Sequence, residues 1–185
     1  MRIIGGSFRG RALASVGKGD AGAHLRPTTD RVRETLFNVL MGGRYGDPIT
    51  DMRCLDVFAG TGALGLEALS RGASHTTFVE TGRKGQSLIR ENIALCDCKT
   101  TTKLVARDAT RLPANPDAPY DLIFLDPPYA KSMGETALKS ALAGEWIAKD
   151  ALVIWEESAE IAPPPECELL ETRKFGGTNI NFLTT

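Results

Sequence analysis

The 185-residue sequence predicts an α/β domain built on a mostly parallel, doubly wound sheet. Three observations support this fold class. Strand-like and helix-like segments alternate from residue 52 onward, which is the pattern of repeated βα units. A glycine-rich turn at residues 59–62 follows the first of these strands and opens a helix. Residues 168–175 and 179–183 flank a pair of glycines and predict a hairpin that gives the sheet an antiparallel end.

The region before the sheet predicts a small extension and one helix. Residues 2–13 indicate two short strands around a glycine-rich turn, which is a β-hairpin pattern. Thr29 and Asp30 can cap a helix whose apolar residues recur three or four positions apart. We therefore divide the chain into a basic N-terminal hairpin and loop, residues 1–28, and a main domain, residues 29–185.

The alternating elements of the main domain follow from local composition. Short apolar runs predict strands, and longer segments with apolar residues on one face predict helices. Seven strands are expected, at residues 53–58, 75–80, 101–106, 120–126, 151–155, 168–175 and 179–183. Three helices are expected between them, at residues 63–70, 83–95 and 134–142. In such sheets ligands bind outside the carboxyl ends of the strands, so the residues that follow each strand are the candidates for function.

Bulk composition excludes several classes. No apolar run approaches the ~20 residues that span a bilayer, and residues 1–6 do not resemble a signal peptide. We expect a cytoplasmic protein that does not bind membranes. The four cysteines and two histidines lack zinc-site spacing, so no metal is expected.

Charge is distributed unevenly along the chain. Residues 1–33 carry seven basic side chains, mostly arginine, and two acidic ones, whereas the rest carries 15 basic and 21 acidic. A basic arm on an acidic body suits contact with phosphates, although a solvated charged surface explains it equally well. The preference for arginine favours a nucleic acid, because a guanidinium makes forked contacts with phosphate.

The segment Gly60-Thr61-Gly62-Ala63-Leu64-Gly65 matches the G-x-G-x-x-G pattern, between a strand and a helix. Such glycines allow a tight turn and let a nucleoside cofactor approach the backbone. Glu80 ends the next strand, where an acidic side chain meets ribose hydroxyls. NAD and S-adenosylmethionine both fit this pattern.

Three neighbouring features favour S-adenosylmethionine. Asp56 is expected beside the turn, where a carboxylate can face the cofactor's ammonium group but repels a pyrophosphate. The segment 58–62 resembles the first motif of class I methyltransferases. Asp108 follows the third strand, where that family's acidic residue accepts a hydrogen bond from adenine. The candidate cofactor-binding residues are Asp56, Phe58, Gly60, Thr61, Gly62, Leu64, Glu80, Asp108 and Ala109.

Both carboxylates also have a structural interpretation. Asp56 can accept N–H bonds from the loop at the strand end. Asp108 can cap a helix, and one residue can serve both purposes.

The fourth strand ends in Asp126-Pro127-Pro128-Tyr129, the candidate catalytic segment. It resembles the D/N-P-P-Y/F motif of methyltransferases that act on amino groups. A base amine is a poor nucleophile, and Asp126 Oδ with a carbonyl of the proline turn can accept its two N–H bonds. The prolines stiffen the loop, and Tyr129 offers a stacking face for the base. The alternative is that Asp126 caps a turn and Tyr129 packs.

Further segments resemble one family across most of the chain, the bacterial small-subunit ribosomal RNA guanine-N2 methyltransferases. The segments that carry the resemblance are 2–6, 9–11, 25–38, 55–72 and 126–129. The resemblance implies a Rossmann-like class I methyltransferase fold, S-adenosylmethionine as methyl donor, and the N2 amino group of one guanine in 16S rRNA as target. It also implies that the substrate is the small subunit or an assembly intermediate.

The resemblance further implies that the basic hairpin and the segment 26–33 contact the rRNA backbone. The candidate substrate-binding residues are Arg2, Arg9, Arg11, Arg26, Thr28 and Tyr129. Arg31 and Arg33 have the simpler interpretation of solvated helix residues. We expect a monomer.

Three other functions are consistent with parts of the pattern. A DNA adenine-N6 methyltransferase shares the tetrapeptide but usually has an added recognition region. An NAD-dependent oxidoreductase shares the glycine turn but needs a side chain that handles the hydride chemistry. An inactive RNA-binding module accounts for the basic arm alone.

Overall fold

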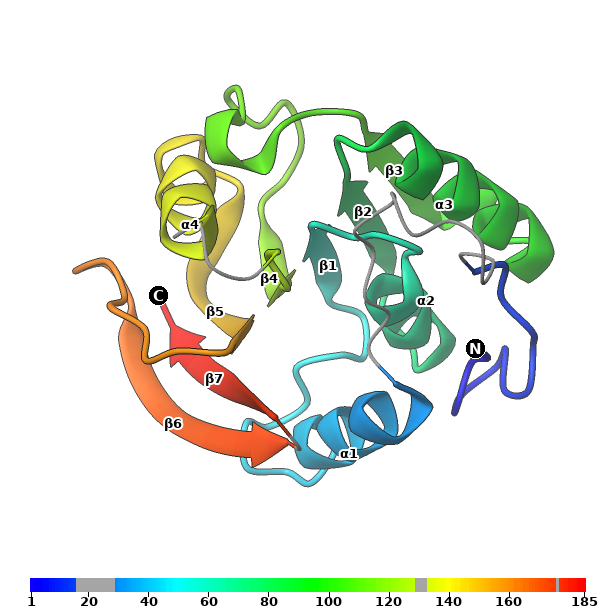
Figure 1. Cartoon of the computed structure of the whole chain (residues 1–185), viewed down its shortest axis with the longest axis horizontal. Helices are drawn as coiled ribbons and strands as arrows, with labels where there is room; N and C mark the ends of the chain where they lie inside the picture. Colours follow the sequence, from blue (N-terminus) through cyan, green and yellow to red (C-terminus); the bar gives the residue numbers. More distant parts are fainter. Residues whose placement is uncertain (16–28, 129–132, 176) are drawn as a thin grey trace.

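The computed structural model describes residues 1–15, 29–128, 133–175 and 177–185. Seven strands form one sheet in the order β3-β2-β1-β4-β5-β7-β6 (Figure 1). Their bounds are β1 Arg53–Val57, β2 His75–Val79, β3 Thr102–Val105, β4 Tyr120–Leu125, β5 Ile147–Glu157, β6 Glu168–Phe175 and β7 Thr178–Thr184. Strands β1 to β5 pair in parallel, and β7 runs antiparallel to both β5 and β6. The predicted mostly parallel sheet with an antiparallel C-terminal strand is confirmed.

Helices cover both faces of the sheet. α1 (Asp30–Leu40), α2 (Ala63–Ser70) and α3 (Arg83–Cys96) pack on one face and share one apolar core cluster. α4 (Met133–Ala143) packs on the other face in a second cluster (Figure 1). Two short 3-10 helices, η2 (Lys99–Thr101) and η3 (Ala109–Arg111), adjoin β3.

The strands in the middle of the sheet are buried on both sides. In β1, Cys54 belongs to the core beneath α1 to α3, and Leu55 belongs to the core beneath α4. In β4, Phe124 belongs to the core beneath α1 to α3, and Leu125 belongs to the core beneath α4. Consecutive apolar residues are needed because successive side chains point to opposite faces and both faces carry helices.

The predicted N-terminal hairpin is not confirmed. Residues 1–14, which we call the N-terminal arm, double back with one isolated antiparallel bridge, between Arg2 and Ala12. Backbone N–H groups of the arm bond to a side chain of α2 instead of to another strand. The Glu67 carboxylate accepts the N–H bonds of Ile4 and Gly5, each at 2.8 Å. The proposed domain boundary at residue 28 stays a prediction, and Ile3 of the arm lies in the main core.

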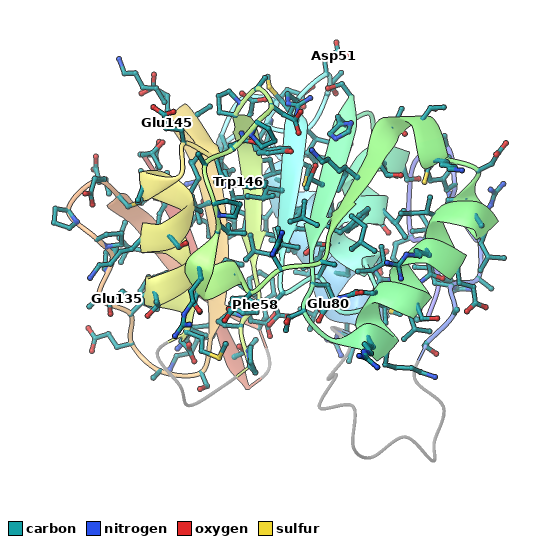
Figure 2. All side chains as sticks on the ribbon, turned by 90° about the horizontal axis from the view of Figure 1, so that it is seen from above. Asp51, Phe58, Glu80, Glu135, Glu145 and Trp146 are labelled. Atoms are coloured by element: carbon teal, nitrogen blue, oxygen red, sulfur yellow. The ribbon has the colours of Figure 1, made fainter. Side chains whose placement is uncertain are left out.

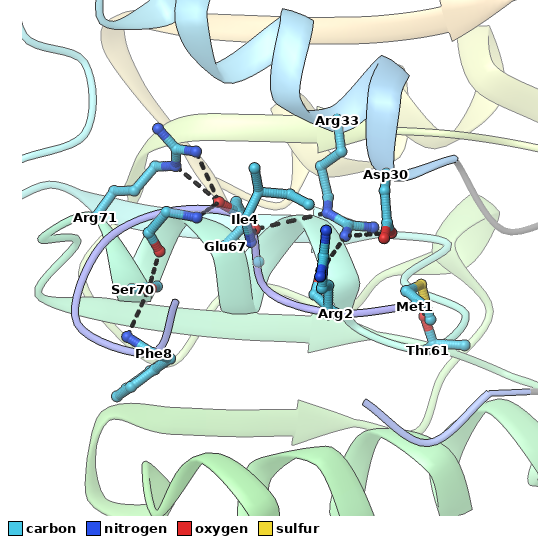
Figure 3. Close-up of polar contacts among 12 residues, drawn as sticks. Met1, Arg2, Ile4, Phe8, Asp30, Arg33, Thr61, Glu67, Ser70 and Arg71 are labelled. Carbon is cyan, nitrogen blue, oxygen red and sulfur yellow. Dashed lines mark hydrogen bonds and ion pairs between the residues drawn. The ribbon is translucent and has the colours of Figure 1, made fainter. Parts of the chain in front are cut away.

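The arm is fixed by a buried charge cluster (Figure 3). Arg33 of α1 has no exposed side-chain area, donates to the carbonyl of Arg2, and pairs with Asp30 at 2.9 Å and with Glu67 at 3.6 Å. Arg71 pairs with the same Glu67 carboxylate at 2.8 Å. The interpretation of Arg33 as a solvated residue or RNA contact is therefore wrong, because its guanidinium is used inside the fold.

No helix in the described parts of the chain has both the length and the apolar character to cross a membrane.

Candidate active site

The carboxyl ends of four strands meet at one edge of the sheet. The residues that pair across this edge are Val105, Val79, Val57 and Leu125, on β3, β2, β1 and β4. The segments that follow are therefore neighbours, and they hold most of the candidate residues. Phe58 and Glu80 lie at this edge, whereas Asp51 and Glu145 lie at the opposite end (Figure 2).

The turn after β1 requires left-handed backbone at three positions. Phe58, Gly60 and Gly62 have φ angles of 60°, 56° and 77°. Glycine adopts this conformation easily, but an aromatic residue there is strained, and such residues concentrate at functional sites. The strand was predicted to include Phe58. It ends at Val57 instead, because the chain reverses at this point.

The last glycine of the pattern brings α2 against the sheet. A Cβ atom on Gly65 would lie 2.6 Å from both Phe78 Cε1 and Thr76 Cγ2 of β2. The glycine pattern therefore has the packing role expected of its third member. Leu64 packs against this core while half-buried.

Three buried side chains from three elements hold the turn. Glu80, which follows β2, accepts the N–H of Gly60 at 2.9 Å with one oxygen and the N–H of Gly82 at 2.6 Å with the other. Asp56 of β1 accepts the N–H of Gly65 at 2.9 Å. Asn92 of α3 donates to the carbonyl of Thr61 at 2.9 Å. The turn and the start of α2 are thus held in shape by the protein's own side chains.

The edge is electrostatically suited to a cation. Burial raises the pKa of Asp56 to about 8, the N–H of Gly65 opposes this shift, and the negative charge of Glu80 adds to it. A positive charge brought near these carboxylates favours the ionised form of Asp56. A nucleoside cofactor with an ammonium and a sulfonium group therefore fits these residues, and a pyrophosphate does not.

Both aspartates accept backbone N–H bonds. For Asp56 the donor is Gly65 of α2 and not the loop at the strand end. Asp108 caps η3, where its carboxylate accepts the N–H and the hydroxyl of Thr110 at 2.9 and 2.8 Å, and these bonds lower the pKa of Asp108. Asp108 is exposed and the adjacent Ala109 is buried. Their cofactor-binding roles stay predictions.

The candidate catalytic segment starts beside the glycine turn. The N–H of Asp126 lies 3.4 Å from the carbonyl oxygen of Val57, the last residue of β1. Asp126 is half-buried, Pro127 is buried and Pro128 is exposed. Tyr129, Arg26 and Thr28 lie outside the described residues, so their predicted roles stay predictions.

The three described arginines of the arm differ in their surroundings. Arg2 and Arg9 are exposed and line a cavity of about 250 Å³ between the arm and α1, together with Asp30 and Glu34. Arg11 donates to the carbonyl of Leu95 at 2.7 Å and lies over the Phe8 ring. Arg2 and Arg9 are therefore better placed than Arg11 to contact a polymer.

Two residues at the site were missed in the sequence. A Cβ atom on Gly85 of α3 would lie 2.8 Å from Glu80 Cγ and 2.9 Å from the carbonyl oxygen of Gly60, so only glycine fits there. Asn92 is fully buried beneath the turn. The sequence contains a signal for each residue. Gly85 is a glycine in the first turn of a helix, Asn92 is an amide on an apolar helix face, and both are uncommon at such positions.

Comparison with known proteins shows the family to which this chain belongs. The model of the family described as "Conserved hypothetical protein 95" matches residues 1–184. "Ribosomal RNA small subunit methyltransferase D" of Escherichia coli strain K12 is 39% identical over 164 residues, which cover 89% of this chain and 78% of that protein. The protein of the same name from Haemophilus influenzae is 35% identical over 182 residues, covering 95% of this chain and 89% of that one.

A solved structure gives the same result. The Escherichia coli protein yhhF superposes with a TM-score of 0.81 at 35% identity and covers 100% of this chain and 97% of its own. Similarity in both sequence and structure thus extends over the arm, the glycine turn and the Asp126 segment together. The chain belongs to the family of ribosomal RNA small subunit methyltransferase D.

Proposed function

We propose that this protein transfers a methyl group from S-adenosylmethionine to the N2 amino group of a guanine in small-subunit rRNA. As a member of its family, the chain is an rRNA methyltransferase. The observation that carries the proposal is the pairing of Val57 with Leu125, which sets the Asp126 segment beside the glycine turn. A methyl donor held by the turn and an amine held by Asp126 are then within reach of each other.

The chain's residues fit this donor. S-adenosylmethionine supplies a methyl group on a positively charged sulfur, together with its own leaving group. Gly60 and Gly62 let a nucleoside approach the backbone closely, and Glu80 lies at the end of β2, where ribose hydroxyls are bound in this type of sheet. The buried Asp56 gives the edge a preference for a cationic ligand.

Asp126 acts on the amine. Its carboxylate accepts an N–H bond from the exocyclic amine, which helps to direct the nitrogen lone pair at the methyl group, and it can take the proton that leaves after transfer. Pro127 and Pro128 keep this loop stiff, which matters because in-line transfer depends on alignment. Holding reactants in near-attack geometry is worth ~7–11 kcal/mol of barrier.

The arm supplies the polymer contacts. Arg2 and Arg9 are exposed on the arm, which is itself anchored to α2. A guanine has to be unstacked to reach the Asp126 segment, so phosphate contacts away from this segment must hold the RNA while the base is displaced. We propose that the preferred substrate is an assembled or partly assembled small subunit and that the protein acts as a monomer.

Transfer of tritiated methyl groups tests this proposal. We expect label in rRNA of undermethylated 30S particles, little label in duplex DNA, and N2-methylguanine on nucleoside mass spectrometry. Asp126→Ala should abolish transfer and leave RNA binding largely intact. Asp117→Asn is the matched control, because Asp117 is exposed and lies ahead of β4, at the other end of the strand.

The two alternative enzymes predict different experimental results. Label in duplex DNA but not in 30S particles would instead indicate the adenine-N6 enzyme. Binding of NADH without binding of S-adenosylhomocysteine in calorimetry would indicate the oxidoreductase.

A further inference from the structure

A buried amide joins the N-terminal arm to the glycine turn. Asn92 of α3 has no exposed area. Its Nδ2 donates to the carbonyl of Thr61 at 2.9 Å and to the carbonyl of Ala14 at 3.1 Å, and its Oδ1 accepts the N–H of Ala14 at 2.7 Å. Thr61 lies between the two left-handed glycines of the turn, and Ala14 is the last residue of the arm.

The orientation of this amide is fixed by its partners. Two of the three partner groups are carbonyl oxygens and one is an N–H. If the amide were reversed, its oxygen would face two carbonyls and the N–H of Ala14 would face the NH₂ group. Leaving buried polar groups unpaired is unfavourable, so Asn92, Thr61 and Ala14 hold one arrangement together.

The arm approaches the turn at both of its ends. Met1 Sδ lies 3.9 Å from Thr61 Oγ1, and Figure 3 shows the two side chains next to each other. Between these ends the arm carries Arg2 and Arg9, the exposed candidates for RNA contact. The arm, which is the proposed RNA-binding segment, is therefore linked by hydrogen bonds to Thr61 of the glycine turn, directly through Met1 and indirectly through Asn92.

We infer that Asn92 is a positioning residue that couples cofactor binding to RNA binding. The inference rests on the proposed function. A cofactor that orders the turn fixes the Thr61 carbonyl, which fixes Asn92 and, through it, the end of the arm. RNA that orders the arm acts on the turn by the same bonds. Since coupling between two binding equilibria is reciprocal, each ligand raises the affinity of the other by the same factor.

The test compares two arm anchors, only one of which touches the turn. Ser70 accepts the N–H of Phe8 at 2.9 Å and donates to the carbonyl of Gly5 at 2.5 Å, but none of its hydrogen bonds reaches residues 59–62. Ser70→Ala is therefore the matched control for Asn92→Ala. For each protein, the affinity for undermethylated 30S particles is measured with and without saturating S-adenosylhomocysteine.

In the wild-type protein we expect S-adenosylhomocysteine to raise the affinity for the particles about fivefold or more. Ser70→Ala should weaken binding but keep this ratio, and Asn92→Ala should bring the ratio close to one. An unchanged ratio in Asn92→Ala, or no effect of S-adenosylhomocysteine in the wild-type protein, overturns the inference. Absence of methyl transfer to the particles is a different result, which counts against the proposed function.

A second measurement starts from the wild-type protein alone. S-adenosylhomocysteine alone should slow hydrogen exchange at the Ala14 amide of the wild-type protein, although this amide lies outside the turn. Asn92→Ser should lose most of that protection. If the exchange rate at Ala14 is the same with and without S-adenosylhomocysteine, the arm and the turn are independent.

Discussion

Arg33 of α1 and Glu67 of α2 form an ion pair at 3.6 Å in which neither side chain has exposed area. The same carboxylate accepts two backbone N–H bonds from the arm and pairs with Arg71. One glutamate thus connects the first helix, the second helix and the arm.

Glu67→Ala should be strongly destabilising. It removes one of the carboxylates that pair with the buried Arg33 guanidinium, and it removes the acceptor of the Ile4 and Gly5 N–H groups. Losing one member of a buried pair costs ~3–5 kcal/mol. Urea denaturation measures the change in the free energy of unfolding. Glu135→Ala, which breaks an exposed pair with Lys139, serves as control and should change it by less than ~1 kcal/mol. Equal effects of the two substitutions would refute the role of Glu67.

Gly65→Ala should disturb the contact between α2 and the sheet. The added methyl group would lie 2.6 Å from Phe78 and Thr76 of β2. Overpacking of this kind costs ~1–3 kcal/mol. The melting temperature should fall, and calorimetry should show weaker binding of S-adenosylhomocysteine because the turn shifts. Gly177→Ala is the control, since nothing lies within 4 Å of a Cβ at that position. A stable Gly65→Ala protein with unaltered binding would show that this packing is unimportant.

Asp56 makes stability depend on pH in a defined direction. Its pKa is about 8 in the folded protein, against ~3.9 for aspartate in an unfolded chain. Between these values the folded state retains a proton that the unfolded state has released. The free energy of unfolding therefore falls as the pH rises from about 4 towards 8.

Asp56→Asn removes this dependence. We expect the variant to exceed the wild-type protein in stability by more than ~1 kcal/mol at about pH 9, and by much less at about pH 5. Urea titrations of both proteins across this range provide the comparison. A difference that does not vary with pH would contradict the effect of burial on Asp56.

The same substitution should weaken ligand binding. If Asp56 faces the cofactor's ammonium group, its loss removes a charge-assisted interaction worth ~1.5–3 kcal/mol, or about tenfold or more in affinity. Calorimetry with S-adenosylhomocysteine measures this effect. Unchanged affinity would leave Asp56 with the structural role alone.

Arg9→Ala should weaken RNA binding in a salt-dependent manner. Removing one phosphate contact lowers the slope of log affinity against log salt by about one. Filter binding to 30S particles at several salt concentrations gives the slope. Lys139→Ala on α4 is the control, because Lys139 lies in an exposed pair on the other face of the sheet. A similar change of slope in both variants would mean that the contact is not specific to the arm.

The sheet and the location of the site could be predicted because both depend on local patterns. Alternating apolar segments determine a parallel sheet, and its carboxyl edge collects the residues that follow each strand. The positions of Glu80 and Asp126 follow from this rule, since a residue that directly follows a buried parallel strand lies at the carboxyl edge of the sheet.

The parts that were missed depend on contacts between distant segments. The burial of Arg33 has no local signal in the sequence, because it depends on a contact with Glu67, 34 positions later. The arm forms one isolated bridge instead of two strands, and the N–H groups of four of its residues bond to side chains of α2 and α3, namely those of Ile4, Gly5, Phe8 and Ala14. β5 begins at Ile147, four residues before the predicted start, and includes Asp150 at a φ of 60° with an irregular register against β4. An irregularity of this kind does not change the periodic pattern of apolar residues from which strands are predicted.

The position of β7 has a consequence for how the sheet is completed. β6 contacts the rest of the sheet through β7, although β6 precedes β7 in the chain. A nascent chain that has not yet extended beyond residue 177 has β5 as an open edge and β6 without a docking partner. Open edges are templates for association with other chains. Synthesis of β7 therefore covers the open edge of β5 and gives β6 its place in the sheet.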